Sequence, residues 1–467
     1  MNQRPPQSSR VAVVGGGLAG LAAGCALAGS GFHVTLFERR PYLGGRASSY
    51  EHPGTGEVVD NCQHVLLGCC TNLIQFYERL GVESKIHWYD RLTFLEPGGR
   101  ASVIEPSKLP APFHNAPAFL RAACLDLSDK LAIGIAMVAL APSVPQDTGE
   151  SFLTWLHRHE QTKPAIERFW KPILVSALNE DLDRMSVPYA AQVVRESFLK
   201  SAAAGRMGVP TVPLTELYGV AGDYIAARGG EVRFRCSVES FVPEPNEVKL
   251  LASGGEATFD FVVFAVPFDV LSRMLPQISA AEPLRRVLGR FETSPITGIH
   301  LWFDRQITEL DHAVLLDRTL QWMFHKSKLL GRNENGNGSY VELVVSSSKT
   351  LVEKSKTEII ELALAELREF FPGARDANLV KSTVIKEVHA TYSPRPGVDV
   401  YRPRPQTSWP RVFLAGDWTA SGWPATMEGA VRSGYIAAES VARVTGIRDA
   451  SFVVPDLSPS GFMRLFG

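Results

Sequence analysis

The sequence predicts an α/β fold in which a Rossmann-like domain is interleaved with a second, α+β domain. Three observations predict it: a βαβ unit with a glycine-rich turn near the N-terminus, a return to alternating strands and helices in two later stretches, and a helical, aromatic-rich insertion between them. The 467 residues suffice for two or three domains, each with its own core.

The N-terminal unit starts with a short apolar run, Val11–Val14, that predicts a strand. A helix of small residues follows and ends at Gly29-Ser30-Gly31. His33–Phe37 predicts a second strand. The three elements together have the length expected of a βαβ crossover.

The turn between the first strand and the helix has the pattern G-x-G-x-x-G, formed by Gly15, Gly17 and Gly20. In this pattern the first glycine makes the tight turn, the second lets a pyrophosphate approach the backbone, and the third allows close packing of helix and strand. The helix then begins at Leu18 and Ala19, whose N–H groups point towards the phosphates.

An acidic residue, Glu38, ends the second strand, where a carboxylate can accept hydrogen bonds from both hydroxyls of a ribose. With the strands, the helix and this acid in place, the motif predicts a bound adenine dinucleotide. An acid rather than a base at this position favours FAD or NAD over NADP. Arg39 follows directly, and Gly44-Gly45-Arg46 extends the motif beyond the strand.

The other elements of the predicted Rossmann-like domain come from three parts of the chain. They are a helix over 71–81 closed by Gly81, a helix over 213–228, strands over 232–234, 238–241 and 259–266, a strand over 412–415, and a helix over 425–442.

The rest of the chain predicts the second domain. Residues 86–205 read as largely helical, with one helix capped by Thr148 and another opened by Pro164. Later segments predict strands over 296–303 and 320–324 and a helix over 357–371. We therefore assign 1–87, 206–275 and 405–450 to the Rossmann-like domain, 88–205 and 276–404 to the second domain, and 451–467 to a C-terminal tail.

Composition and charge exclude several classes of protein. The 48 basic and 49 acidic residues leave a net charge of −1, so no nucleic acid is expected as a partner. The six cysteines form no C-x-x-C pair, which predicts reduced thiols in the cytoplasm and no metal site. After the N-terminal βαβ unit, the longest apolar run is Leu131–Ala141. Its 11 residues are too few for a membrane span, which takes about 20.

The extended glycine motif from Val13 to Arg46 resembles the FAD-binding N-terminus of the amine oxidase–phytoene desaturase flavoprotein superfamily. The run ending in Gly416-Asp417 and the segment from Pro424 to Ala430 resemble its C-terminal half. The resemblance implies a GR2-type Rossmann-like domain that binds FAD. The residues expected to bind it are Gly15, Gly17, Leu18, Ala19, Gly20, Glu38, Arg39, Gly45, Arg46, Val238, Gly416, Asp417, Ala425, Thr426 and Met427.

A third motif, the stretch from Val59 to Cys69, resembles the squalene-associated members, the hydroxysqualene dehydroxylases. This resemblance implies reduction of hydroxysqualene to squalene, in which reduced flavin delivers a hydride to an allylic carbon and water is lost, in squalene and hopanoid biosynthesis. His64 and Asp60 are the expected proton-transferring residues. Because no second G-x-G-x-x-G occurs, the electrons must come from an external donor, either a free reduced cofactor or a redox protein.

Such a substrate is a long apolar isoprenoid and needs a large apolar cavity. Several aromatic residues could line it: Trp155, Trp170, Trp302, Phe303, Trp322, Phe324, Trp418 and Trp423. Because the substrate resides in a bilayer, residues 109–141 are either a face that touches the inner side of the membrane or a buried helical hairpin.

Three alternatives stay open from the sequence. An FAD-dependent desaturase of a polyprenoid such as dehydrosqualene or phytoene would share the fold and the cavity but reverse the electron flow. An amine oxidase is disfavoured, because 59–70 lacks the expected tryptophan and no aromatic cage is evident. A flavin-free prenyl-binding escort protein is disfavoured by the intact set of cofactor residues.

Overall fold

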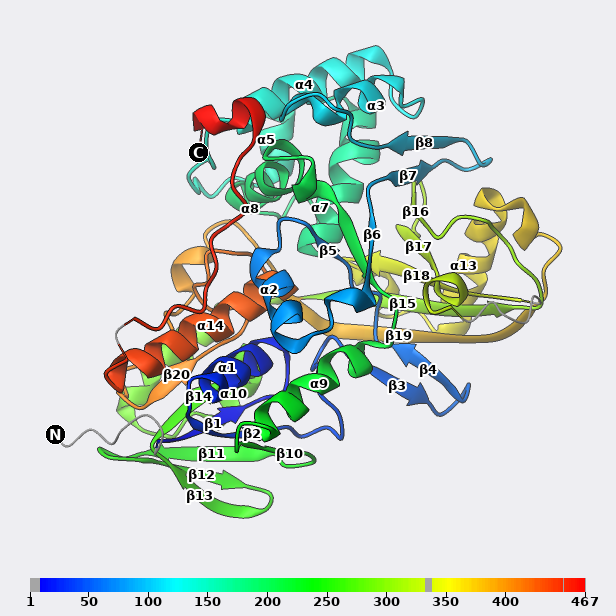
Figure 1. Ribbon diagram of the computed structural model, residues 1–467. Helices are drawn as coiled ribbons and strands as arrows, with labels where there is room; N and C mark the ends of the chain where they lie inside the picture. Colours follow the sequence, from blue (N-terminus) through cyan, green and yellow to red (C-terminus); the bar gives the residue numbers. More distant parts are fainter. Residues whose placement is uncertain (1–8, 332–337, 448, 467) are drawn as a thin grey trace.

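The computed structural model (Figure 1) describes residues 9–331, 338–447 and 449–466. Within them lie a five-stranded sheet, a seven-stranded sheet and three smaller ones. Strands from distant parts of the sequence meet in both large sheets, as expected of two interleaved domains. The limits assigned to those domains stay a prediction.

The five-stranded sheet is parallel and forms the Rossmann-like core. Its strands, in spatial order, are β10 (Glu231–Arg233), β2 (His33–Phe37), β1 (Arg10–Val14), β14 (Phe261–Phe264) and β20 (Val412–Leu414). Side chains of β1 alternate between two cores: Val11 and Val13 face helices, and Ala12 and Val14 face a three-stranded antiparallel sheet. That sheet consists of β11 (Val238–Pro243), β12 (Val248–Ala252) and β13 (Gly255–Phe259).

Helix α1 (Leu18–Gly29) is the crossover of the βαβ unit, and it packs against α14 (Met427–Val444) and α9 (Leu214–Ala226). Contact with both helices leaves α1 almost wholly buried, which explains why its residues are small and apolar on every side. The approach of α14 is so close that a Cβ on Gly434 would lie 2.2 Å from the Ala19 carbonyl oxygen. The N- and C-terminal halves of the predicted cofactor motif are thereby packed together.

The seven-stranded sheet belongs to the second domain. Its order is β19 (Leu379–Tyr392), β15 (Thr293–Phe303), β18 (Ser339–Ser346), β17 (Trp322–His325), β16 (His312–Leu315), β7 (Leu92–Leu95) and β8 (Ala101–Ile104). As predicted, Ile299, Leu301 and Phe303 share one face, where α13 (Lys356–Phe370) covers them.

Helices of residues 116–194 form the top of the molecule in Figure 1. They are α3 (Ala116–Arg121), α4 (Leu127–Leu140), α5 (Phe152–Arg158), α6 (Lys163–Ala165), α7 (Lys171–Leu178) and α8 (Val187–Val194). The cap of α5 corrects the prediction: Ser151, not Thr148, accepts the N–H of Thr154. The prediction that 86–205 is largely helical is also wrong at its start, since 86–104 forms three strands, two of which complete the large sheet.

The remaining strands and α-helices lie outside the two large sheets. They are a hairpin of β3 (Ser49–His52) and β4 (Glu57–Asp60), a sheet of β5 (Leu66–Leu67), β9 (Met207–Pro210) and β6 (Ile86–Tyr89), and the helices α2 (Thr71–Leu80), α10 (Phe268–Met274), α11 (Glu282–Leu288) and α12 (Lys326–Leu329). Helix α2 confirms the prediction over 71–81, with Gly81 in the left-handed region at its C-terminus. The strand expected over 259–266 is interrupted at Asp260, which lies between the end of β13 at Phe259 and the start of β14 at Phe261.

Candidate active site

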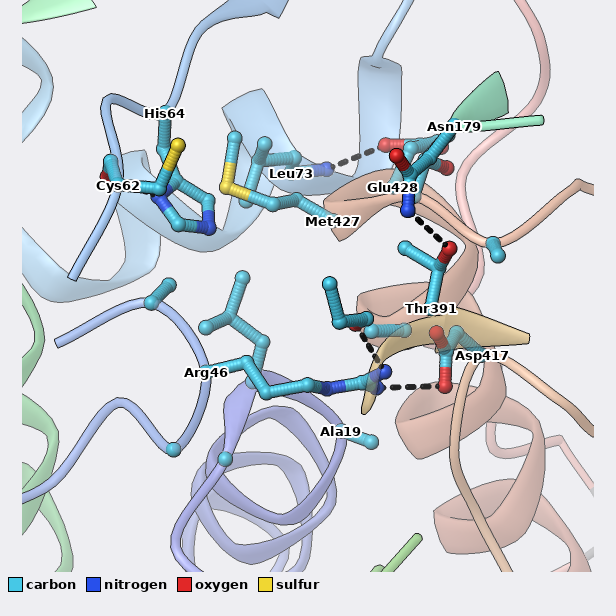
Figure 2. A pocket seen from close by; sticks show the side chains of 18 of the residues that line it. Ala19, Arg46, Cys62, His64, Leu73, Asn179, Thr391, Asp417, Met427 and Glu428 are labelled. Carbon is cyan, nitrogen blue, oxygen red and sulfur yellow. Dashed lines mark hydrogen bonds and ion pairs between the residues drawn. The ribbon is translucent and has the colours of Figure 1, made fainter. Parts of the chain in front are cut away.

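A single cavity of about 490 Å³ joins the Rossmann-like domain to the second domain. One end is lined by the glycine-rich turn and the start of α14, and the other by helices α7 and α8 and the seven-stranded sheet. Figure 2 shows the region where the two meet, with Arg46 and Asp417 on one side and His64 and Asn179 on the other.

The glycine-rich turn has the geometry that the motif predicts. Gly15 has a φ of +110°, in the region that favours glycine, and a Cβ there would lie 2.7 Å from the Ala265 carbonyl oxygen. A Cβ on Gly20 would lie 1.9 Å from the Gly15 carbonyl oxygen, so α1 can begin only if this position has no side chain. Gly17 is the N-cap of α1 and no side chain caps it, so the N–H groups of the first turn are free for a phosphate.

Glu38 is buried directly after β2 and contacts the glycine-rich turn. Its Oε2 accepts the N–H of Gly16 at 2.7 Å, and its Oε1 accepts the N–H of Arg40 at 2.7 Å. Both oxygens retain lone pairs, and the residue lines the cavity. The carboxylate therefore orients the phosphate-binding turn and can also accept ribose hydroxyls.

Arg46 connects the two halves of the cofactor motif. Its Nη2 donates to Asp417 Oδ1 at 2.7 Å, and its Nη1 donates to the Ala390 carbonyl oxygen of β19 at 2.7 Å. Figure 2 shows this side chain extended across the cavity towards Asp417. The pair fixes the position of two residues that the sequence places 371 positions apart.

The N-terminus of α14 faces the same cavity through Thr426 and Met427. Thr426 caps the helix by accepting the N–H of Gly429 at 3.1 Å. Glu428, which follows Met427, is fully buried and accepts the N–H groups of Asn72 and Leu73 at the start of α2. Glu428 therefore has a structural role, because it anchors α2 to the cofactor-facing end of α14.

Nearly all of the predicted cofactor residues line the cavity: Gly15, Gly17, Leu18, Ala19, Glu38, Arg39, Gly45, Arg46, Val238, Gly416, Asp417, Ala425, Thr426 and Met427. Gly20 does not, because it acts through packing at the base of the turn. The glycine cradle, the uncapped start of α1 and the two carboxylates match what a flavin adenine dinucleotide needs: phosphate donors and hydroxyl acceptors. The residues present therefore fit FAD.

His64 lies on the cavity wall opposite this cradle. Its Nδ1 is 2.8 Å from the Cys62 carbonyl oxygen, and an N–H at Nδ1 leaves the lone pair on Nε2. Burial lowers the pKa of His64 below its ordinary value, which favours the neutral ring. A neutral imidazole with a free Nε2 can accept a proton.

Asp60 is not among the residues that line the cavity. It is buried behind the wall and accepts a hydrogen bond from Lys326 Nζ at 2.7 Å. The same ammonium donates to Gln63 Oε1 at 2.6 Å and lies 3.7 Å from Glu342. No signal in the sequence pointed to Lys326 or Glu342.

The ionisation of this buried cluster follows from its charges. Burial raises the pKa of Glu342 to about 8, which favours the protonated form of this carboxyl at neutral pH. Burial also opposes the charge on Asp60, but Lys326 offsets it and the pKa of Asp60 is lowered. Lys326 and Asp60 therefore form one ion pair that anchors the segment leading to His64.

The rest of the cavity is mostly apolar. Of the eight aromatic residues considered as lining, four do line it: Trp322, Phe324, Trp418 and Trp423. The others pack elsewhere, as in the stack of Trp302 on Tyr340, whose ring centroids are 4.3 Å apart. Two polar residues that the sequence did not single out also face the cavity, Asn179 and Thr391, joined at 2.9 Å.

The family of flavin containing amine oxidoreductases matches residues 18–442, which is most of the chain and includes the cofactor residues from Leu18 to Met427. The chain belongs to this family. FAD is its cofactor, and the protein is an FAD-dependent oxidoreductase, as the sequence predicted. The flavin-free escort protein is therefore the alternative that loses support.

The chain is also similar to desaturases of the same superfamily. The 15-cis-phytoene desaturase of Synechococcus elongatus is 28% identical over 457 residues, covering 92% of this chain and 95% of the relative. The probable zeta-carotene desaturase of that organism is 26% identical, covering 94% and 99%. The 15-cis-phytoene desaturase of Arabidopsis thaliana is 27% identical, covering 94% and 81%.

Solved structures share the fold over nearly the whole chain. A putrescine oxidase bound to putrescine superimposes with a TM-score of 0.72 at 16% identity, covering 93% of this chain and 99% of that one. Cyclohexylamine oxidase from Brevibacterium oxydans superimposes with a TM-score of 0.68 at 17% identity, with the same coverage. These similarities confirm the predicted α/β fold with a Rossmann-like FAD domain.

Proposed function

We propose that this flavoenzyme desaturates a long isoprenoid. The observation that supports the proposal is the single cavity in which the FAD-binding residues open directly onto an apolar chamber. The desaturases of phytoene and zeta-carotene among its relatives act on polyprenoids, which such a chamber would accommodate. The sequence-based preference for dehydroxylation of hydroxysqualene finds no support among these relatives, and the desaturase alternative does.

The reaction removes two hydrogens from neighbouring carbons and forms a double bond between them. Bound FAD supplies the hydride acceptor. The second hydrogen leaves as a proton, for which we propose His64 Nε2 as the acceptor. The apolar walls exclude water from the reacting carbons. The two electrons then pass to an external acceptor, whereas a dehydroxylase would need an external donor.

Anaerobic mixing tests the direction of electron flow. Oxidised enzyme mixed with phytoene is expected to lose the visible absorption of oxidised flavin as a desaturated product forms. Photoreduced enzyme mixed with hydroxysqualene is expected to stay reduced. Re-oxidation with formation of squalene would instead establish the dehydroxylase, and reduction by a simple amine but not by phytoene would establish an amine oxidase.

Replacing His64 by glutamine should slow flavin reduction by the isoprenoid about a hundredfold or more, because a positioned general base contributes at least that much. In the wild type the rate should rise with pH through a pKa below the ordinary histidine value, because burial disfavours the protonated ring. Stopped-flow absorbance at several pH values measures both effects.

The exposed His87 on β6 offers a matched control, since His87→Gln removes an imidazole outside the cavity. A His64→Gln enzyme with the wild-type rate and pH profile would remove His64 from the proton-transfer step.

We further propose that the segment 109–141 docks on a membrane. One side of α4 is buried through Ile133, Ala136 and Leu140. The other exposes an apolar stripe in which Leu127, Leu131, Ile135 and Val138 are each more than 60% accessible. Of the two interpretations left open by the sequence, a wholly buried hairpin does not account for this stripe.

The C-terminal tail adds to the same face. Phe462 lies 6.1 Å from Phe113, ring centroid to ring centroid, and its N–H donates to the Ala111 carbonyl oxygen. Leu465 beside it is 78% accessible, and Figure 1 shows the tail ending next to α4 and α5. Large exposed apolar side chains gathered in this way are typical of an interaction site. None of the helices within 9–331, 338–447 and 449–466 is long and apolar enough to span a bilayer.

The paired substitution Leu131→Asp and Ile135→Asp should weaken binding to vesicles of phosphatidylcholine and phosphatidylglycerol about tenfold or more, because each buried leucine-sized side chain contributes about 1.5–3 kcal/mol. Co-sedimentation measures the effect. Val242→Asp, at another exposed apolar position on β11, should leave vesicle binding unchanged. Equal binding by all three proteins would place the docking face elsewhere.

A further inference from the structure

Arg402 is a buried arginine that neither the sequence nor the cofactor motif singled out. It follows β19 in the chain, and its side chain is only 1% exposed. Its Nη2 lies 3.0 Å from the Asp417 carbonyl oxygen, 2.7 Å from the Trp423 carbonyl oxygen and 3.1 Å from Ser421 Oγ. One guanidinium nitrogen thus contacts three points of the segment 416–423, which we call the flavin turn.

The flavin turn is shaped by glycines and faces the cofactor cavity. Gly416 has a φ of +137° and Gly422 a φ of +76°, both in the region that favours glycine. Asp417, Trp418 and Trp423 line the cavity. Within the turn itself only a few short-range hydrogen bonds are formed, such as the Thr419 hydroxyl to the Gly416 carbonyl oxygen. Arg402 therefore supplies the contacts that span the turn from end to end.

The other side of the guanidinium binds the second domain. Its Nη1 donates to the hydroxyl of Tyr189 on α8 at 2.7 Å and to Asp399 Oδ1 at 3.2 Å. The guanidinium carbon lies 5.5 Å from the ring centroid of Tyr392 on β19 and 5.9 Å from that of Tyr189. Helix α8 also lines the cavity, and its Gln192 donates to the Gly422 carbonyl oxygen at 2.9 Å.

These contacts bridge two walls of one cavity. A guanidinium can do this where a lysine cannot, because its planar fork presents donors in two directions at once. A charged group removed from water is retained at such a position when its donors are matched by acceptors, and each charge-assisted hydrogen bond is stronger than a neutral one.

We propose that Arg402 is a positioning residue for FAD: it holds the flavin turn, and with it Asp417, in the conformation that binds the cofactor, and it ties this conformation to α8. Arg402 does not line the cavity and is not expected to touch the flavin. The inference rests on the FAD site and not on the identity of the substrate, so it stands or falls independently of the proposed desaturation.

The test is the affinity of the apoprotein for FAD, followed by quenching of FAD fluorescence, together with the melting temperature of apo- and holoprotein. Arg402→Met should weaken FAD binding about tenfold or more, because charge-assisted hydrogen bonds to the turn are lost. It should also narrow the gap between the two melting temperatures. Arg402→Lys, which keeps a charged donor for the turn but cannot also reach Tyr189 on α8, should recover only part of the affinity.

Two further variants separate positioning from a general loss of stability. Arg404→Met, at an exposed arginine two residues along the chain, should bind FAD like the wild type. Tyr189→Phe removes only the hydroxyl on the α8 side and should weaken FAD binding by a smaller factor. If Arg402→Met does not fold, the FAD affinity of Tyr189→Phe tests the positioning role instead. Wild-type FAD affinity in every folded Arg402 and Tyr189 variant, with only the apoprotein melting temperature lowered, would overturn the proposal.

Discussion

The Gly20→Ala protein should be purified without FAD. The added Cβ would lie 1.9 Å from the Gly15 carbonyl oxygen and 3.2 Å from the Ala265 side chain, so the glycine-rich turn and the first turn of α1 must move apart. That movement displaces the free N–H groups at the helix N-terminus from the phosphates they would bind. We expect at least about a hundredfold loss of FAD affinity, because several phosphate hydrogen bonds are lost together. The absorption spectrum and an FAD titration measure it.

A glycine in another helix provides the control. Gly219 lies in α9, and a Cβ there would meet nothing within 4 Å. Gly219→Ala should keep wild-type flavin content and gain slightly in stability, since alanine favours the helix by about 1 kcal/mol. A Gly20→Ala protein that retains stoichiometric FAD would show that the turn adapts to a side chain.

The Lys326→Met protein should be strongly destabilised, by about 3–5 kcal/mol, because it leaves the carboxylate of Asp60 buried without its counter-charge. Lys326 is 2% exposed and Asp60 is 5% exposed, and the two groups are 2.7 Å apart. Denaturant unfolding at neutral pH, where the raised pKa of Glu342 favours its protonated form, measures the change. Because Lys326 also holds Gln63, the position of His64 should be disturbed in any protein that folds.

Lys328 is a matched control on the same helix. Its side chain is 22% exposed and pairs at 3.1 Å with Glu309, which is 89% exposed. Such a pair is worth at most about 1 kcal/mol, so Lys328→Met should change the unfolding free energy little. If the two variants were equally stable, the buried ion pair would not anchor the segment before His64.

The cofactor site was largely predictable from the sequence because its parts are local. Gly15 has a φ of +110° and Gly20 packs against the Gly15 carbonyl oxygen, so both glycines are required within one turn, and Glu38 directly follows the next strand. A pattern of residue types at fixed spacing is therefore enough to indicate a phosphate-binding turn and the acid beside it. The C-terminal half was found only through a resemblance, since Gly416-Asp417 alone carries no specific signal.

The catalytic side of the cavity was less predictable. His64 was placed on the wall as expected, but Asp60, expected to share its role, lies behind the wall and binds Lys326, which is 266 residues away in the chain. Whether a buried carboxylate faces substrate or a counter-ion depends on which distant residue packs against it. Neither spacing nor composition contains that information, and the same is true of Arg402 and Asn179.

The seven-stranded sheet of the second domain was also only partly predictable from the sequence. Strand β15 was predicted from alternating side chains, whereas β18 has every residue buried and therefore no period-two pattern to detect. Strands β7 and β8 were missed because they are short and join a sheet whose other strands come much later in the chain.

By itself, the sequence determined the FAD-binding βαβ unit, because backbone sterics and hydrogen bonding within a few dozen residues require those glycines and that acid. Only the tertiary structure decided what surrounds the flavin: an apolar chamber, an ion pair behind its wall, and an arginine that bridges two domains. These features depend on contacts between residues hundreds of positions apart. The free energy of a buried charge depends on which of these distant residues pairs with it.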